Sequence, residues 1–163
     1  MIEIQLLRAD HADAVHAFER DNRAYFAAWV GDRGDDYFAE FAVRHRELLA
    51  EQATGRHRFH VVVDGSGEVL GRVNLVDIED GEAELGYRIA RRATGAGVAT
   101  AAVRRVCETA HRYGLRSLRA RATVANPGSR TVLARTGFTR VGDVAMAGGP
   151  GVLFRRSLGP SAD

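Results

Sequence analysis

The chain has 163 residues, of which 45% are hydrophobic and 27% charged, the composition of an ordinary soluble globular domain. No apolar run approaches the roughly 18 residues that a membrane helix needs. The first ten residues, MIEIQLLRAD, lack the basic start and long apolar stretch of a signal peptide.

Cysteine usage and charge distribution narrow the class further. The single cysteine, Cys107, excludes an intrachain disulfide and fits a reducing cytoplasm, and its helical spacing from Val103 and Ala110 favours a packed core thiol over a nucleophile. Every basic residue is arginine: residues 1–87 hold 18 acids and 9 arginines, whereas residues 88–140 hold 12 arginines and one acid. The second stretch indicates an anionic ligand, with a solvated arginine-rich surface as the alternative.

The first half predicts two helices and then strands. Asp10 is placed to cap a helix whose apolar face runs from Val15 to Trp29, the sequence GDRGDD breaks it, and a second helix carries apolar residues from Phe38 to Leu49. Alternating or buried-strand patterns, joined by tight turns, follow at residues 58–64, 68–78 and 82–90.

The second half alternates helices and strands. A helix is expected at 98–113 with Gly114 as its end, followed by a strand at 117–125, a short helix at 126–137 and two strands that flank the turn at 148–151. No repeat or linker interrupts the pattern, so a single α/β domain is expected over residues 1–163. The six histidines show no metal-ligand spacing, and we predict no metal.

The turn TGAGVAT, residues 94–100, leads into the helix through Gly95 and Gly97. A P-loop is excluded because that motif needs a lysine and the chain has none. The spacing of Gly95, Gly97 and Thr100 nearly fits a dinucleotide fingerprint, but antiparallel hairpins precede it and no acid stands at 116–121 to hold a ribose. Free amides at a helix N-terminus nevertheless attract anions, and small side chains let a pyrophosphate reach the backbone. The pattern therefore predicts phosphate binding without naming the ligand.

The order of these elements resembles the GNAT superfamily of acetyl-CoA-dependent N-acetyltransferases over nearly the whole chain. Residues 94–99 match its Q/R-x-x-G-x-G/A loop, with Thr94 in place of Gln or Arg. The chain is most similar to the ribosomal-protein N-terminal acetyltransferases, through AELGYRI before the loop, NPGSRTVLARTGF after it and the opening residues 6–30. The resemblance implies a GNAT-like α/β (α+β) domain whose mixed, mostly antiparallel sheet of about six or seven strands is flanked by helices.

The resemblance also implies how acetyl-CoA is held, between splayed strands at 82–90 and 117–125. The pantetheine arm would pair with the strand edge at Tyr87, Arg88 and Ile89, where an amide near Ile89 would stabilise the oxyanion. The pyrophosphate would lie on the amides of Gly95, Ala96, Gly97, Val98, Ala99 and Thr100. Asn126 precedes a proline and fits a turn; the resemblance gives its side-chain amide a role in binding the pantetheine arm.

Two catalytic roles follow from the same resemblance. Glu84 stands where the subgroup carries a glutamate and would act as the base; Glu82 shares its face, and a pair of solvent-facing acids is an equal alternative. Arg121 occupies the position where some relatives place a base on the neighbouring strand. Leu133 replaces the tyrosine that many relatives use as the acid, which makes Ser129 the candidate, although a serine there also fits a helix cap.

The resemblance implies direct attack of an amine on the thioester. A protein N-terminus or a small amine, amine antibiotics included, is the expected acceptor, and the acidic residues 1–87 favour a cationic one. Tyr25, Trp29 and Asn74 could line the acceptor side, while core packing explains Trp29 equally well. The alternatives are a non-catalytic acyl-CoA-binding regulator and a nucleic-acid-binding module, the latter poorly supplied with aromatic residues. A cytoplasmic protein with no membrane partner is expected, and a homodimer is possible.

Overall fold

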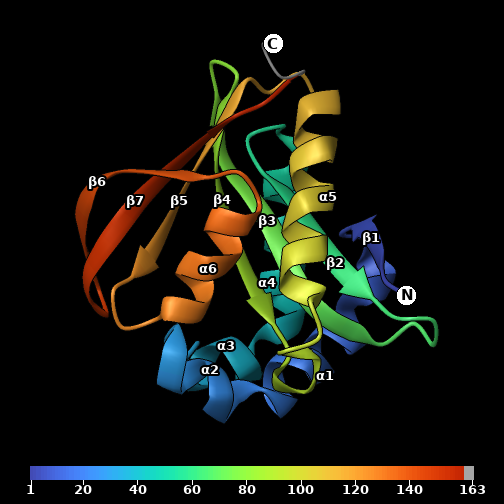
Figure 1. Ribbon diagram of the computed structural model, residues 1–163. Coiled ribbons are helices and arrows are strands. Elements are labelled where there is room, and N and C mark those ends of the chain that lie inside the picture. Colours follow the sequence, from blue (N-terminus) through green and yellow to red (C-terminus); the bar gives the residue numbers. More distant parts are fainter. Residues whose placement is uncertain (160–163) are drawn as a thin grey trace.

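A central sheet runs through the molecule and helices cover both of its faces (Figure 1). The computed structural model describes residues 1–159. The strands are β1 Glu3–Leu6, β2 Arg58–Val63, β3 Val69–Glu79, β4 Glu82–Ile89, β5 Ser117–Thr123, β6 Thr139–Met146 and β7 Gly149–Ser157. They form one seven-stranded sheet in the order β1-β2-β3-β4-β5-β7-β6, parallel between β4 and β5 and antiparallel elsewhere. The mixed, mostly antiparallel α/β fold is confirmed.

The helices divide between the two faces and bury a separate apolar core on each. Their bounds are α1 Ala12–Asp21, α2 Arg23–Trp29, α3 Asp35–Ala39, α4 Phe41–Ala53, α5 Val98–Arg112 and α6 Pro127–Arg135. One core packs α5 and α6 against the sheet, and the other packs α1, α2 and α4 against its opposite face. Because both faces are covered, β2 and the first half of β3 are buried at nearly every position. None of the helices within residues 1–159 has the length and apolarity to cross a membrane.

Local sequence explains where the elements beside the site end. The β3–β4 hairpin turns through Asp80 and Gly81, both at positive φ (52° and 77°), the backbone that an Asp-Gly pair favours in tight hairpins. Helix α5 ends where the Gly114 amide donates to the His111 carbonyl and the Leu115 amide to the Ala110 carbonyl. These paired bonds close the helix with a glycine in the left-handed region, at φ 89°, as expected for Gly114.

The N-terminal region departs from the expectation in four places. Asp10 does not cap α1; it lies in a 3₁₀ turn, Ala9–His11, and pairs with Arg8. The first helix is divided at Asn22, whose side chain donates to the Phe18 carbonyl and ends α1. The second expected helix is likewise divided, at Glu40, into α3 and α4. Strand β1 was not expected, because four residues give too short an alternation to detect and its pairing with β2 is non-local.

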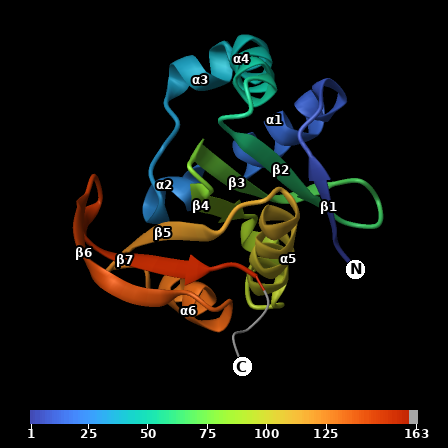
Figure 2. The ribbon, with the colours of Figure 1, turned by 90° about the horizontal axis from the view of Figure 1, so that it is seen from above.

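The pairing between β4 and β5 is brief and then stops. Only Glu82–Glu84 pair with Ser117–Arg119, in parallel, after which the two strands diverge. Figures 1 and 2 show β5, β7 and β6 turning away from the plane of β1–β4. The gap that opens beyond Glu84 leaves one edge of β4 unpaired, as the predicted splay of the two strands requires.

Candidate active site

A cleft of about 530 Å³ occupies the gap beside β4. Its walls are the end of β4, the loop and first turn of α5, the first turns of α6 and the side of α2. It brings together most of the residues that the sequence singles out: Tyr87, Arg88, Ile89, Gly95, Gly97, Val98, Ala99, Thr100, Asn126 and Ser129. Ala96 is an exposed member of the same loop but does not line the cleft, and neither does Glu84.

The loop before α5 presents unused backbone donors to this cleft. In the described chain, the amides of residues 95–100 donate no hydrogen bond to another protein group. Gly95 and Gly97 have positive φ angles, 79° and 77°, and a Cβ on either would meet nothing within 4 Å. The loop is therefore an open cradle of N–H groups at the positive end of a 15-residue helix. It fits a phosphate or pyrophosphate group.

Ser129 and Tyr87 meet across the cleft. The Tyr87 hydroxyl donates to the Ser129 Oγ at 3.0 Å, which leaves the proton of the serine hydroxyl for another acceptor. Burial raises the pKa of Tyr87, so its hydroxyl remains a donor at neutral pH. Ser129 does not cap α6. The Asn126 Oδ1 accepts from the Ser129 amide at 3.2 Å, with Pro127 at the first helical position.

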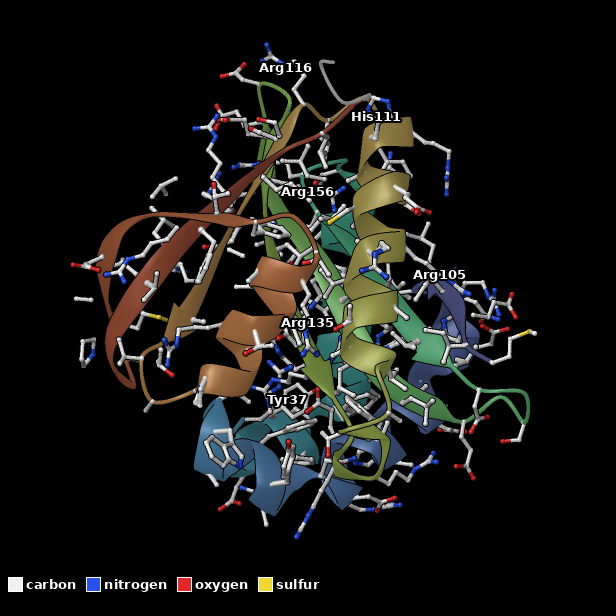
Figure 3. The ribbon with its side chains drawn as sticks, in the orientation of Figure 1. Tyr37, Arg105, His111, Arg116, Arg135 and Arg156 are labelled. Carbon is white, nitrogen blue, oxygen red and sulfur yellow. The ribbon has the colours of Figure 1, made fainter. Side chains whose placement is uncertain are left out.

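A second, smaller cleft of about 160 Å³ adjoins the first across the splayed strands. Trp29, Val30, Tyr87, Asn126 and Ser129 line both clefts. The Trp29 side chain is 51% exposed, so lining of the cleft, and not core packing, explains it. Further lining residues of the larger cleft, Phe26, Val132 and Arg135, were missed because nothing in their local sequence separates them from core or surface positions. Arg135 ends α6 and lies between α6 and α5 (Figure 3).

Glu84 and Glu82 lie outside the cleft, on the part of β4 that is still paired with β5. The Arg121 guanidinium holds Glu84 through both of its oxygens, Nε to Oε1 at 2.7 Å and Nη2 to Oε2 at 3.2 Å. Glu82 accepts from the Ser117 hydroxyl and pairs with Arg155, and these contacts lower the pKa of its carboxyl. A carboxylate offers about four lone-pair positions, so the paired Glu84 still has two free.

Residues 1–159 contain no group of three or more histidine, cysteine, aspartate or glutamate side chains arranged to hold a metal ion. The larger cleft offers backbone amides, six hydroxyl side chains that include Tyr87 and Ser129, the side-chain amide of Asn126 and two guanidiniums, and the Glu84–Arg121 pair lies nearby.

Comparison with known proteins agrees with this geometry. The acetyltransferase (GNAT) domain model matches residues 2–139. The chain is 26% identical to the probable N-acetyltransferase YjcK of Bacillus subtilis (strain 168) over 148 residues, 86% of this chain and 82% of that protein.

Two solved structures share the fold. The ribosomal-protein-S5-alanine acetyltransferase of Vibrio fischeri superposes with a TM-score of 0.89 at 20% identity, covering 96% of this chain and 93% of that one. The spermidine N-acetyltransferase of Vibrio cholerae, in complex with CoA and spermine, has a TM-score of 0.82 at 17% identity, covering 96% and 95%.

Proposed function

The chain belongs to the GNAT family of acetyl-CoA-dependent N-acetyltransferases, and we propose that it acetylates a primary amine, which attacks the thioester of acetyl-CoA directly. The observation that carries the proposal is the open cradle of amides at 95–100 beside the unpaired edge of β4. The pyrophosphate of acetyl-CoA binds the cradle, and the pantetheine arm binds along Tyr87, Arg88 and Ile89. The thioester then lies in the gap between β4 and β5, where the two clefts meet.

Asn126 serves the cofactor and the helix at once. Its Oδ1 is occupied by the Ser129 amide, so its Nδ2 is the group that faces the pantetheine carbonyls. Because the two roles use different atoms of the Asn126 side chain, the cofactor contact that the resemblance implies is compatible with the observed cap of α6.

Proton transfer falls to two groups on either side of the thioester. Ser129 donates to the departing thiolate, because Tyr87 occupies the serine oxygen as a donor and leaves the serine proton free. Glu84 accepts the proton of the attacking amine through water, since its remaining lone pairs face away from Arg121 and it does not line either cleft. A backbone amide near Ile89 stabilises the oxyanion.

The acceptor is an amine that enters from the side of the smaller cleft. The names of the similar structures describe acetylation of a ribosomal-protein alanine and of spermidine, which are both amines. Trp29 and Gly86 line this smaller cleft and border the route to the thioester.

Thiol release from acetyl-CoA, measured with and without a panel of amines, tests the proposal. We expect amine-dependent release of free CoA with formation of the matching N-acetyl product by mass spectrometry. Tight binding of acetyl-CoA with no release for any amine would instead support a non-catalytic acyl-CoA-binding regulator. A panel that includes amine antibiotics, polyamines, amino acids and short peptides separates the acceptor classes.

A further inference from the structure

Three cross-strand pairs face α1–α4 next to the gap. Arg72 lies opposite Arg88, Asn74 opposite Gly86, and Val76 opposite Glu84. Because side chains alternate along strands, these positions share one face of the sheet. A Cβ on Gly86 would meet nothing within 4 Å, and Gly86 lines the smaller cleft. The strand backbone is therefore accessible from this face at Gly86.

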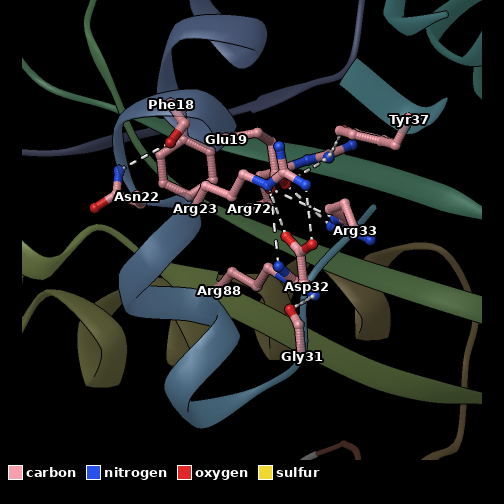
Figure 4. A network of polar contacts seen from close by, with 10 residues as sticks. All are labelled: Phe18, Glu19, Asn22, Arg23, Gly31, Asp32, Arg33, Tyr37, Arg72 and Arg88. Carbon is pink, nitrogen blue, oxygen red and sulfur yellow. Dashed lines mark hydrogen bonds and ion pairs between the residues drawn. The ribbon is translucent and has the colours of Figure 1, made fainter. Parts of the chain in front are cut away.

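Positive charge exceeds negative charge at one side of this opening. Glu19 of α1, which is 1% exposed, pairs with Arg33 at 3.0 Å, Arg72 at 3.1 Å and Arg88 at 3.8 Å (Figure 4). Within residues 1–159, Glu19 is the only carboxylate at ion-pairing distance from these three guanidiniums. The nearby Asp32 and Asp35 are taken by Arg23.

The energetic consequence is an unbalanced cluster. Like charges directly opposite one another on neighbouring strands are destabilising, and Arg72 and Arg88 are such a pair. Burial and the charge of Arg33 lower the pKa of Arg88 to about 10. Burial alone would raise the pKa of the Glu19 carboxyl, but Arg33, Arg72 and Arg88 lower it, so Glu19 stays ionised and is already fully used. A further anion would offset part of the excess positive charge.

Three polar atoms on this face make no hydrogen bond within the protein. They are the Arg72 Nε, the Arg88 Nη1 and the Asn74 Oδ1, all buried. Two are donors beside the opening, and one is an acceptor opposite Gly86. A buried polar atom without a hydrogen bond costs free energy, so the arginines of this cluster are incompletely compensated inside the protein, and an anion that reaches the accessible parts of Arg33 and Arg88 would offset this cost.

We propose that this surface is a subsite for an acceptor amine that also carries a carboxylate a few bonds away, the chemistry of an amino acid. The inference rests on the proposed function and adds the substrate class. The carboxylate binds Arg88, which lines the larger cleft, and Arg33, whose side chain is 31% exposed, while the amine lies beside the open backbone of Gly86. Gly86 and Arg88 lie about 7 Å apart along β4. A small amino acid with its amine beside Gly86 can therefore place its carboxylate within reach of the Arg88 side chain.

This subsite opposes the expectation of a cationic acceptor. That expectation came from the acidic residues 1–87 as a whole, but the charge beside the opening is positive. The smaller cleft has one charged lining residue, Arg121, which is paired with Glu84. Its lining therefore includes no carboxylate that could bind the positive charges of a polyamine.

Matched acceptors that differ only in the carboxylate test the proposal. Alanine is compared with alaninamide, and a tetrapeptide that begins with alanine and aspartate with one that begins with alanine and asparagine. Because a carboxylate makes the neighbouring amine more basic, kcat/KM is calculated on the concentration of unprotonated amine. We then expect it to be about 10- to 100-fold higher for the carboxylate member of at least one pair, the value of a charged hydrogen-bonded contact. A preference in the first pair identifies a free amino acid, and in the second an acidic N-terminus. Equal rates in both pairs overturn the proposal.

The variant Arg33→Gln should abolish that preference through a higher KM for the carboxylate acceptor. The control Arg20→Gln removes an equal charge from α1, where Arg20 directly follows Glu19 in the sequence but is 62% exposed and pairs with Asp21, and it should keep the preference. A loss of acetyl-CoA affinity in Arg33→Gln, with the preference intact, would assign the cluster to the cofactor and overturn the inference.

A binding measurement is independent of turnover. Trp29 is the only tryptophan and lines both clefts, so its fluorescence reports occupancy. With CoA bound, N-acetylalanine should bind about tenfold more tightly than N-acetylalaninamide, and Arg33→Gln should remove the difference. Equal binding, or binding of neither, overturns the subsite. Failure of the proposed function would appear separately, as absent CoA binding or absent thiol release with every amine.

Discussion

Ser129 acquires its candidate role from two neighbours. Asn126 takes over the cap of α6, and the Tyr87 hydroxyl donates to the Ser129 Oγ, so the serine proton is left without a structural task. The choice between cap and acid, which the sequence leaves open, is narrowed by these contacts, because a serine that does not cap contributes little to helix stability.

The variant Ser129→Ala should therefore lose turnover without losing stability. We expect turnover to fall by about 10²–10⁴-fold, the usual effect of removing a general acid, with acetyl-CoA affinity little changed. The melting temperature should stay close to that of the wild type, since Asn126 still caps α6. Steady-state kinetics and thermal unfolding of the same preparation check both parts. Near-normal turnover would remove Ser129 from the mechanism.

His60 makes the stability depend on pH. It is 2% exposed; its Nδ1 donates to the Val73 carbonyl at 3.1 Å, so its Nε2 accepts from the Tyr113 hydroxyl at 3.2 Å. Burial lowers its pKa from 6.5 to about 4. Between these values the unfolded chain binds a proton that the folded chain does not, so stability is full above the unfolded pKa and falls as the pH drops.

Urea unfolding at pH 7 and pH 5 measures this effect. His60 should account for a loss of about 2 kcal/mol over that interval. The variant His60→Gln should be less stable at pH 7 but should lose less stability on acidification than the wild type. Identical losses in the two proteins would show that His60 is not the group responsible.

At the scale of elements, the site forms where strands β4 and β5 diverge. The ion pair of Glu84 with Arg121 joins the two strands at the last paired position, and the gap begins directly beyond it. Glu84 therefore lies where the gap between the strands begins, two residues before Gly86, whose backbone is accessible.

The variant Glu84→Gln should lower turnover most at low pH, where more of the acceptor amine is protonated and a base matters most. Arg121→Gln is the matched control, because it breaks the same ion pair and keeps the carboxylate. If Glu84 acts as the base, only Glu84→Gln changes the shape of the pH–rate profile. If the pair only joins the strands, both variants should weaken acetyl-CoA binding alike, with the profile unchanged.

The loop at the start of α5 is tested by Gly97→Val. The branched side chain would occupy the approach of the pyrophosphate, and we expect acetyl-CoA binding to be lost in calorimetry. Gly67→Val in the β2–β3 turn is the control, since Gly67 has a similar φ of 85° against 77° and equally open surroundings. Both variants carry a similar backbone strain of about 1–2 kcal/mol. Unchanged affinity in a folded Gly97→Val protein would reject the loop as the pyrophosphate site.

Elements with strong local patterns could be predicted from the sequence, and elements fixed by distant contacts could not. Helix α5 and the β3–β4 hairpin follow from apolar spacing, Gly114 and the Asp-Gly turn. Strand β1 forms only because β2 pairs with it, and α1 ends at Asn22 through a side-chain bond to Phe18.

The same distinction holds for the site. The glycine loop is a continuous motif and was located, whereas the group of Glu19, Arg33, Arg72 and Arg88 joins segments 14 and 53 residues apart in sequence. No local sequence pattern predicts such a group, since each arginine taken alone is typical of a surface residue.

On the scale of the whole molecule, the charge asymmetry of the sequence is not a simple division into acidic and basic faces. The acidic first half contributes α1–α4, yet its buried carboxylate Glu19 is surrounded by arginines from three segments. The basic stretch from Arg88 onward includes the elements around the cleft, α5, β5 and α6. Local geometry, and not net charge, therefore decides which groups a ligand meets.

The central claim is that acetyl-CoA lies between β4 and β5 with its pyrophosphate on the amides of 95–100. Amide hydrogen exchange with and without CoA tests it most directly, because those amides have no protein acceptor in the described chain. The account predicts slower exchange in the presence of CoA at residues 85–89, 95–100 and 126–129, with little change in the β2–β3 turn. Protection that spares residues 95–100, or that appears instead around Ser66 and Gly67, would contradict it.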